Sequence, residues 1–154
     1  MTEEINLRVE VSKAVRGAPA AALIKDVLAR AATVPEIRAR LSSGASSVAV
    51  RLTSDAELRR LNRAYAGEDH ATDVLSFEGD GDHLGDIAIS WPATVRQSKE
   101  YGHSETTELA LLSVHGLLHL AGWDHVSATE RKEMNRLTVV ALKASGIKVA
   151  AGRL

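Results

Sequence analysis

The chain has 154 residues, a formal net charge of −1 and no cysteine. This length fits one domain, residues 1–154, and the small net charge gives no general sign of a nucleic-acid binder. The lack of cysteine excludes disulfides and thiolate metal sites, and with no signal-peptide core or apolar run of ~18 residues we expect a cytoplasmic protein without a membrane span.

Charge is distributed unevenly along the chain. Residues 1–63 carry 11 basic and 7 acidic side chains, residues 64–125 carry 2 and 11, and residues 126–154 carry 6 and 2. All six histidines fall in the acidic middle segment. Carboxylates and imidazoles together are ligands for a cation, although most acidic segments are only solvated surface.

Hydrophobic periodicity divides the chain into strands and helices. Strands are expected at 5–11, at 46–52 after a turn at Ser43–Gly44, and at 72–77 and 84–90 as a hairpin. Helices are expected at 18–32 with Pro19 in the first turn, from Ser54 to Gly67, from Pro92 to Gly102, over 104–121, and from Ser127 to Gly146. These elements predict an α+β fold, a mixed four-stranded sheet with about five helices.

Two of the predicted helices have clear local signals. Ser54 and Glu57 form a capping box, and an apolar stripe of Leu58, Leu61 and Tyr65 follows. The helix over 104–121 starts at the N-cap Ser104, with acidic residues in its first turns.

Three histidines stand within and just after the helix at 104–121. His115 and His119 are four residues apart and therefore share one face of that helix. Gly122 can adopt the left-handed conformation that ends a helix, which would turn His125 back toward the first pair. Gly in this place and the three-histidine spacing match the zinc-binding pattern H-E-x-x-H-x-x-G-x-x-H.

Three interpretations of these histidines compete. One histidine on an apolar helix is usually a core residue bonded to a carbonyl, and a pH switch needs no convergent geometry. Three at this spacing favour a metal site. Nitrogen ligands without sulfur make one Zn²⁺ ion the first choice, with nickel, copper or manganese able to compete in vitro, and three ligands leave a position open for water.

Gly116 stands where zinc proteases carry a catalytic glutamate. It cannot accept a proton, and glycine in a helix costs up to ~1 kcal/mol against alanine, so a close approach by a backbone or a substrate is expected there. Peptide hydrolysis becomes less favoured, and metal-assisted phosphodiester cleavage more favoured.

Three stretches together resemble one bacterial protein family. HGLLHLAGWDH, residues 115–125, resembles the H-G-x-L-H-L-x-G-[aromatic]-D-H signature of the YbeY family. LNRAYAGEDHATDVLSF, residues 61–77, and LGDIAIS, residues 84–90, resemble two further segments of that family in the same order and spacing.

This resemblance implies a zinc-dependent endoribonuclease specific for single-stranded RNA. It would act in 16S rRNA 3′-end maturation and ribosome quality control, with zinc held by His115, His119 and His125 on a central helix. Its implied partners are rRNA, ribosomal subunits, ribosomal proteins and the GTPase Era. A ribosome-associated assembly factor with a mainly structural metal, and a hydrolase of another substrate, are the alternatives.

The sequence departs from the family pattern after Tyr65. The family has an arginine there that is important for activity, whereas this chain has Ala66; Arg63, three residues earlier, is a weak catalytic candidate in its place. The loop after Phe77 is also shorter than is usual in the family. We expect the basic residues of 51–63 to form an RNA-facing rim.

Other polar residues admit a structural explanation as well as a functional one. Asp124 is a weak candidate for a proton acceptor, but orienting His125 or shaping the turn explains it better. Caps or turns explain Asp73 and Asp86 equally well, and a place in or near the core is expected for Trp123. The remaining histidines lack ligand spacing and are expected at the surface; they are His70, His83 and His103.

Overall fold

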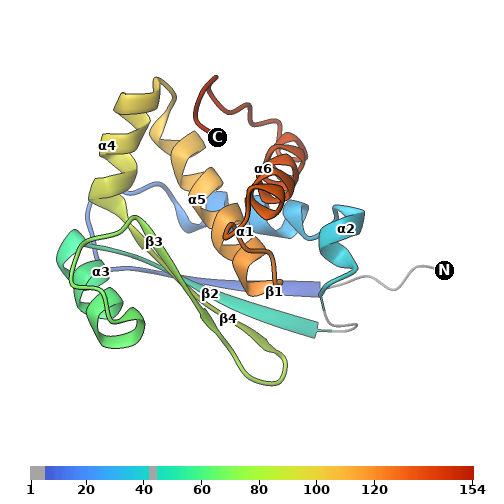
Figure 1. Ribbon diagram of the computed structural model, residues 1–154, viewed down its shortest axis with the longest axis horizontal. Helices are drawn as coiled ribbons and strands as arrows, with labels where there is room; N and C mark the ends of the chain where they lie inside the picture. Colours follow the sequence, from blue (N-terminus) through green and yellow to red (C-terminus); the bar gives the residue numbers. More distant parts are fainter. Residues whose placement is uncertain (1–5, 42–44) are drawn as a thin grey trace.

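A four-stranded mixed sheet forms the base of the molecule (Figure 1). In spatial order its strands are β1 (Asn6–Lys13), β2 (Ala45–Thr53), β4 (His83–Ser90) and β3 (Val74–Glu78). β1, β2 and β4 run parallel, and β3 pairs antiparallel with β4, so the predicted α+β class and hairpin are confirmed. The computed structural model describes residues 6–41 and 45–154, and the predicted turn at Ser43–Gly44 lies outside them.

Helices cover one face of this sheet in Figure 1, with α1, α5 and α6 on the same side. The helices of the described residues are α1 (Ala21–Ala31), α2 (Pro35–Arg38), α3 (Asp55–Leu61), the π-helical turn η1 (Asn62–Ala66), α4 (Trp91–Tyr101), α5 (Glu105–Leu120) and α6 (Ala128–Lys143). The five predicted helices account for all of these segments except α2, since the one expected from Ser54 to Gly67 covers both α3 and η1. α2 is too short to show a periodic pattern. The serine N-caps at Ser54, Ser104 and Ser127 are confirmed.

The core lies between the sheet and α5. Val48, Val50 and Leu52 alternate along β2 and are all buried. α5 packs on β3 and β4 and contacts α1, α4 and α6, which explains why it is apolar on almost every side. A helix held from several directions is a rigid support for side chains at its C-terminal end. Within the described residues, none of the helices combines the length and apolar composition that a bilayer crossing requires.

Two local expectations prove wrong. Pro19 precedes α1, which begins at Ala21 after the N-cap Ala20, and so does not stand in the first helical turn. Tyr65 does not extend the buried stripe of Leu58: its side chain is 73% exposed. The wider π-helical turn η1 changes the angle between successive residues, which takes Tyr65 out of line with the α-helical stripe.

Candidate metal centre

Three histidine rings meet at the C-terminal end of α5. The ring centroids of His115 and His119 are 5.2 Å apart, and that of His125 lies 5.7 Å from the first and 5.0 Å from the second. One nitrogen from each ring lies within 4.8 Å of the others. Nitrogens that share a tetrahedral zinc ion at ~2.0–2.1 Å lie roughly 3.3 Å apart, so the three rings converge closely enough to hold one ion.

Gly122 makes this convergence possible. Its φ of 99° lies in the left-handed region, and its N–H donates to the carbonyl of His119 at 3.0 Å. The N–H of Trp123 donates back to the carbonyl of Leu118, also at 3.0 Å, which closes the helix end. A Cβ at Gly122 would meet only the Arg40 Nη1 at 3.6 Å, so conformation rather than space favours glycine. The predicted helix break is confirmed.

Two of the three rings, those of His115 and His119, are held in the form that binds metals. Burial, followed by the proximity of His119 and His125, lowers the pKa of His115 to about 4. Burial, followed by the charge of His125, also lowers the pKa of His119. Both imidazoles are therefore neutral at pH 7, and a neutral imidazole is the form that ligates a metal. The chemistry of the donor set fits a divalent transition metal.

A core role for these histidines would require a carbonyl or carboxylate on each ring. Among the described residues no hydrogen bond reaches a ring nitrogen of the three, and Asp124 Oδ1 is 3.8 Å from His125 Nδ1, beyond hydrogen-bond reach. Asp124 instead accepts the backbone N–H of His125 at 2.7 Å and is half-exposed, which is the turn-shaping role. Its part in proton transfer stays a prediction.

Gly116 faces the sheet. The sequence predicts a backbone or a substrate close to this glycine, but the neighbouring group is the side chain of Ile87. A Cβ there would lie 2.7 Å from Ile87 Cγ2 of β4. The carbonyl of Gly116 accepts a hydrogen bond from the Ser76 hydroxyl of β3 at 3.1 Å, which ties the helix to the sheet. Packing of α5 on β4 therefore explains the glycine, and a glutamate at this position would not fit.

A cavity of about 290 Å³ opens beside the histidines. Its walls come from α5 and the turn after it, the residue before β3, helix α6 and the last residues of the chain; they include His115, His125, Asp73, Arg131, Asn135 and Arg153. Asp73 also accepts a hydrogen bond from Gln97 Nε2 at 3.2 Å. The weak candidate Arg63 is not among the residues that line this cavity.

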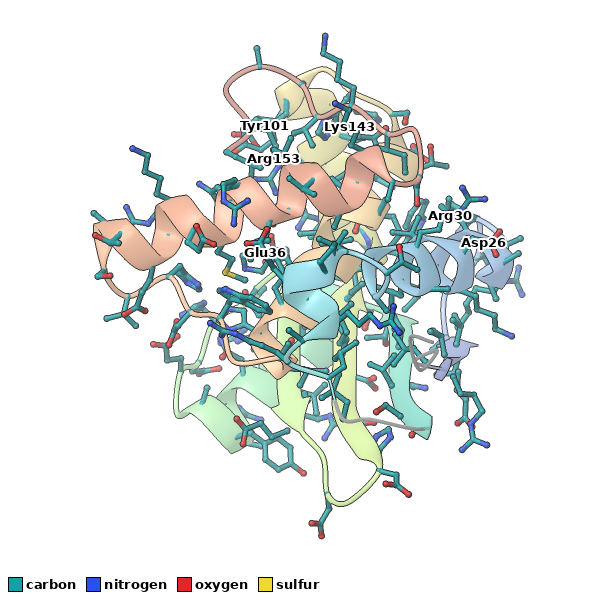
Figure 2. All side chains as sticks on the ribbon, turned by 90° about the vertical axis from the view of Figure 1, so that its right-hand side faces the viewer. Asp26, Arg30, Glu36, Tyr101, Lys143 and Arg153 are labelled. Atoms are coloured by element: carbon teal, nitrogen blue, oxygen red, sulfur yellow. The ribbon has the colours of Figure 1, made fainter. Side chains whose placement is uncertain are left out.

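A second polar cluster lies toward the other end of α5 and corrects the expectation for His103. That side chain is only 7% exposed, and its Nε2 lies 2.6 Å from Oε1 of the fully buried Glu108. Arg153 forms two hydrogen bonds with the same carboxylate, at 3.0 and 2.7 Å, and its guanidinium lies over the Tyr101 ring (Figure 2). The expectation fails because only the tertiary fold brings Glu108 and Arg153 to His103.

The other single residues follow their expected places. His70 is exposed beside Glu68, and His83 is partly exposed and paired with Asp86. Trp123 is 7% exposed and has the Arg40 guanidinium 3.8 Å from its ring centroid, so it belongs to the core and is covered against stacking on a base.

The expected basic rim at 51–63 is largely paired. Arg51 bonds to Glu57 at 2.5 Å, and Arg59 bonds to Asp69 at 2.9 Å. A groove of about 780 Å³ on the sheet near this rim is lined by Tyr65 and Phe77 among other residues. It contains no convergent set of metal ligands within the described residues.

Comparison with known proteins identifies the family of the chain. A model of the family described as Endoribonuclease YbeY matches residues 6–146. Among the relatives named Endoribonuclease YbeY, that of Roseiflexus sp. is 42% identical over 84% of this chain and 89% of its own length. That of Roseiflexus castenholzii is 45% identical over 68% and 73%, and that of Gloeobacter violaceus 52% identical over 54% and 49%.

A solved structure supports the fold. The solution structure of TM1509 from Thermotoga maritima has a TM-score of 0.59, with 23% sequence identity and coverage of 91% of both chains. The matches in sequence support an endoribonuclease role, and the chain belongs to the endoribonuclease YbeY family.

Proposed function

We propose that this protein is a zinc-dependent endoribonuclease that cleaves single-stranded RNA in the maturation of the 16S rRNA 3′ end and in ribosome quality control. The observation that carries the proposal is the convergence of three imidazoles beside a cavity with arginines in its wall. Family membership supports the reaction class. Zinc is favoured because the donor set is all nitrogen.

His115, His119 and His125 would hold the ion. When bound, zinc supplies a Lewis acid for a phosphoryl oxygen and lowers the pKa of a coordinated water. Gly116 supplies no base, so we assign the role of orienting a water or accepting its proton to Asp73. Its carboxylate lies in the cavity wall and accepts a hydrogen bond from Gln97. Arginine in the same wall attracts the RNA backbone.

The proposed partners follow from the family resemblance. They are rRNA and ribosomal subunits, with ribosomal proteins and the GTPase Era as protein contacts, and the proposed location is the cytoplasm. The near-zero net charge is compatible with such a role because binding to the ribosome needs only a local basic surface.

A ribosome-associated assembly factor with a mainly structural metal is the second candidate. The observation that favours it is Ala66, which replaces the arginine that the family carries after its motif tyrosine. In that case the histidines would stabilise the end of α5 and the turn to His125, and RNA cleavage would be absent.

The deciding experiment measures precursor 16S rRNA 3′ ends in cells that lack the gene. Wild type, His115→Ala and the control His70→Ala, which changes an exposed histidine outside the cavity, are each tested for rescue. We expect wild type and the control to restore mature ends and His115→Ala to fail. Full rescue by His115→Ala would rule out metal catalysis.

Purified proteins separate the two candidates. Wild type and the two variants are checked for folding by circular dichroism, for metal by elemental analysis, and for cleavage of a single-stranded RNA oligonucleotide. Cleavage by wild type and the control alone supports the enzyme. Bound zinc without any cleavage by wild type supports the assembly factor.

A further inference from the structure

Helix α6 contributes one wall of the histidine cavity. Arg131 and Asn135 both line it, and their spacing of four residues places them on one face of the helix. His115 and His125 line the same cavity. A cation and an uncharged donor on α6 therefore border the space beside two of the three clustered histidines.

The two arginines in this wall differ in what they already bind. Arg153 is 13% exposed and has both Nε and Nη2 bonded to the carboxylate of Glu108. Arg131 is exposed, and its side chain forms no hydrogen bond or ion pair with a residue of the described ranges 6–41 and 45–154. The guanidinium of Arg153 is thus already bonded to Glu108 within the cavity wall. The N–H donors of Arg131 are available to a ligand.

We propose that Arg131 binds a phosphate group of the RNA at the histidine cavity, an inference that rests on the proposed function. A guanidinium presents parallel N–H donors that match two non-bridging phosphate oxygens. Negative charge on these oxygens increases as the phosphodiester is attacked, so this contact strengthens in the transition state. Asn135 adds a neutral donor in the same wall.

The test compares Arg131→Gln with Lys132→Gln in the full-length protein. Lys132 is the adjacent exposed residue of α6, it does not line the cavity, and its replacement removes the same charge. Arg131→Lys keeps the charge without the planar fork. Each protein is assayed for zinc content and for cleavage of a single-stranded RNA oligonucleotide. Binding of the same oligonucleotide is measured at several salt concentrations after metal removal, which prevents cleavage during the measurement.

We expect Arg131→Gln to lower kcat/KM by ~10- to 100-fold, while Lys132→Gln changes it less than ~2-fold. Loss of one phosphate contact should make the dependence of log binding constant on log salt shallower by about 0.7 for a single strand. Arg131→Lys should recover part of the activity, and zinc content should equal that of wild type in all three.

Equal decreases of kcat/KM in Arg131→Gln and Lys132→Gln would overturn the inference. Long-range attraction by positive charge, rather than a direct contact with phosphate, would then explain both decreases. Loss of zinc from Arg131→Gln, or an unchanged salt dependence of binding, would also overturn the inference. If wild type fails to cleave RNA, the proposed function fails, and the binding comparison still decides whether Arg131 contacts phosphate.

Discussion

The histidines at and near the two ends of α5 differ in their hydrogen bonding. His103 has both ring nitrogens engaged: Nε2 faces Glu108 at 2.6 Å, and Nδ1 accepts the N–H of Ala150 at 3.2 Å. In this arrangement Nε2 donates to the Glu108 carboxylate and Nδ1 acts as an acceptor. The rings of His115, His119 and His125 converge on one another and have no such partner in the described part of the chain.

The difference shows how the same side chain serves structure or ligation. A buried ring whose hydrogen bonds are complete holds its surroundings in place, whereas rings that face one another without such bonds can turn their nitrogen lone pairs to a cation. Gln97 joins the two regions, since its Nε2 donates to Asp73 at the cavity and to Glu108 in the ion-pair cluster. Changes at each end should therefore affect different properties.

Removal of one clustered histidine should give the largest effect. His115→Ala or His119→Ala leaves too few ligands, so we expect loss of bound metal and a fall in RNA cleavage of at least ~100-fold, because each ligand is needed to fix the ion. Metal analysis and an oligonucleotide assay measure this, with His70→Ala as the control. Stoichiometric metal and normal cleavage in His119→Ala would contradict metal ligation by this histidine cluster.

Removal of the buried carboxylate should affect stability instead. Glu108→Ala leaves the mostly buried Arg153 and the buried His103 without their acid, so the free energy of unfolding should fall by about 3–5 kcal/mol. Urea unfolding of the metal-free protein measures it. Glu105→Ala, an exposed acid in the first turn of the same helix, should cost under ~1 kcal/mol. Equal losses in both variants would contradict a structural role for the cluster.

Acid should destabilise the end of α5 that bears the three histidines. His115 has a pKa of about 4 in the folded chain, against ~6.5 in the unfolded chain, so between these values only the unfolded chain takes up the proton. The free energy of unfolding of the metal-free protein should be unaffected by this group above pH ~6.5. It should fall as pH decreases toward 4, by roughly 3 kcal/mol at most.

The control for this pH dependence is His115→Asn, which cannot titrate. Urea unfolding of both proteins between pH ~5 and 7.5 isolates the contribution of His115. We expect a shallower loss of stability in the variant. Identical pH profiles would show that burial of this ring does not oppose its protonation.

The contact between Gly116 and Ile87 should give the smallest change. A methyl group at Gly116 would meet Ile87 Cγ2 at 2.7 Å, so Gly116→Ala should destabilise by about 1–2 kcal/mol despite the better helix propensity of alanine. In an Ile87→Ala background, the same substitution should be neutral or stabilising. Thermal unfolding of the double-mutant cycle measures the coupling, and additive effects would rule out the steric explanation.

Short-range sequence patterns were sufficient to predict much of the candidate metal centre. The spacing of His115 and His119, the turn at Gly122 and the serine caps depend on residues within a few positions of one another, and local backbone geometry is the same in most folds. The strand alternation in β2 and the β3–β4 hairpin are likewise local patterns. The family motifs add the expectation of an endoribonuclease.

The tertiary structure alone decided which distant residues complete the cavity. Asp73, Arg131 and Arg153 come from three segments that pack around α5, and no spacing in the sequence relates them. The burial of His103 and the reason for Gly116 also depend on partners far along the chain, Arg153 and Ile87. A sequence records which side chains are present, but the distances that make them partners arise only when helices and sheet pack together.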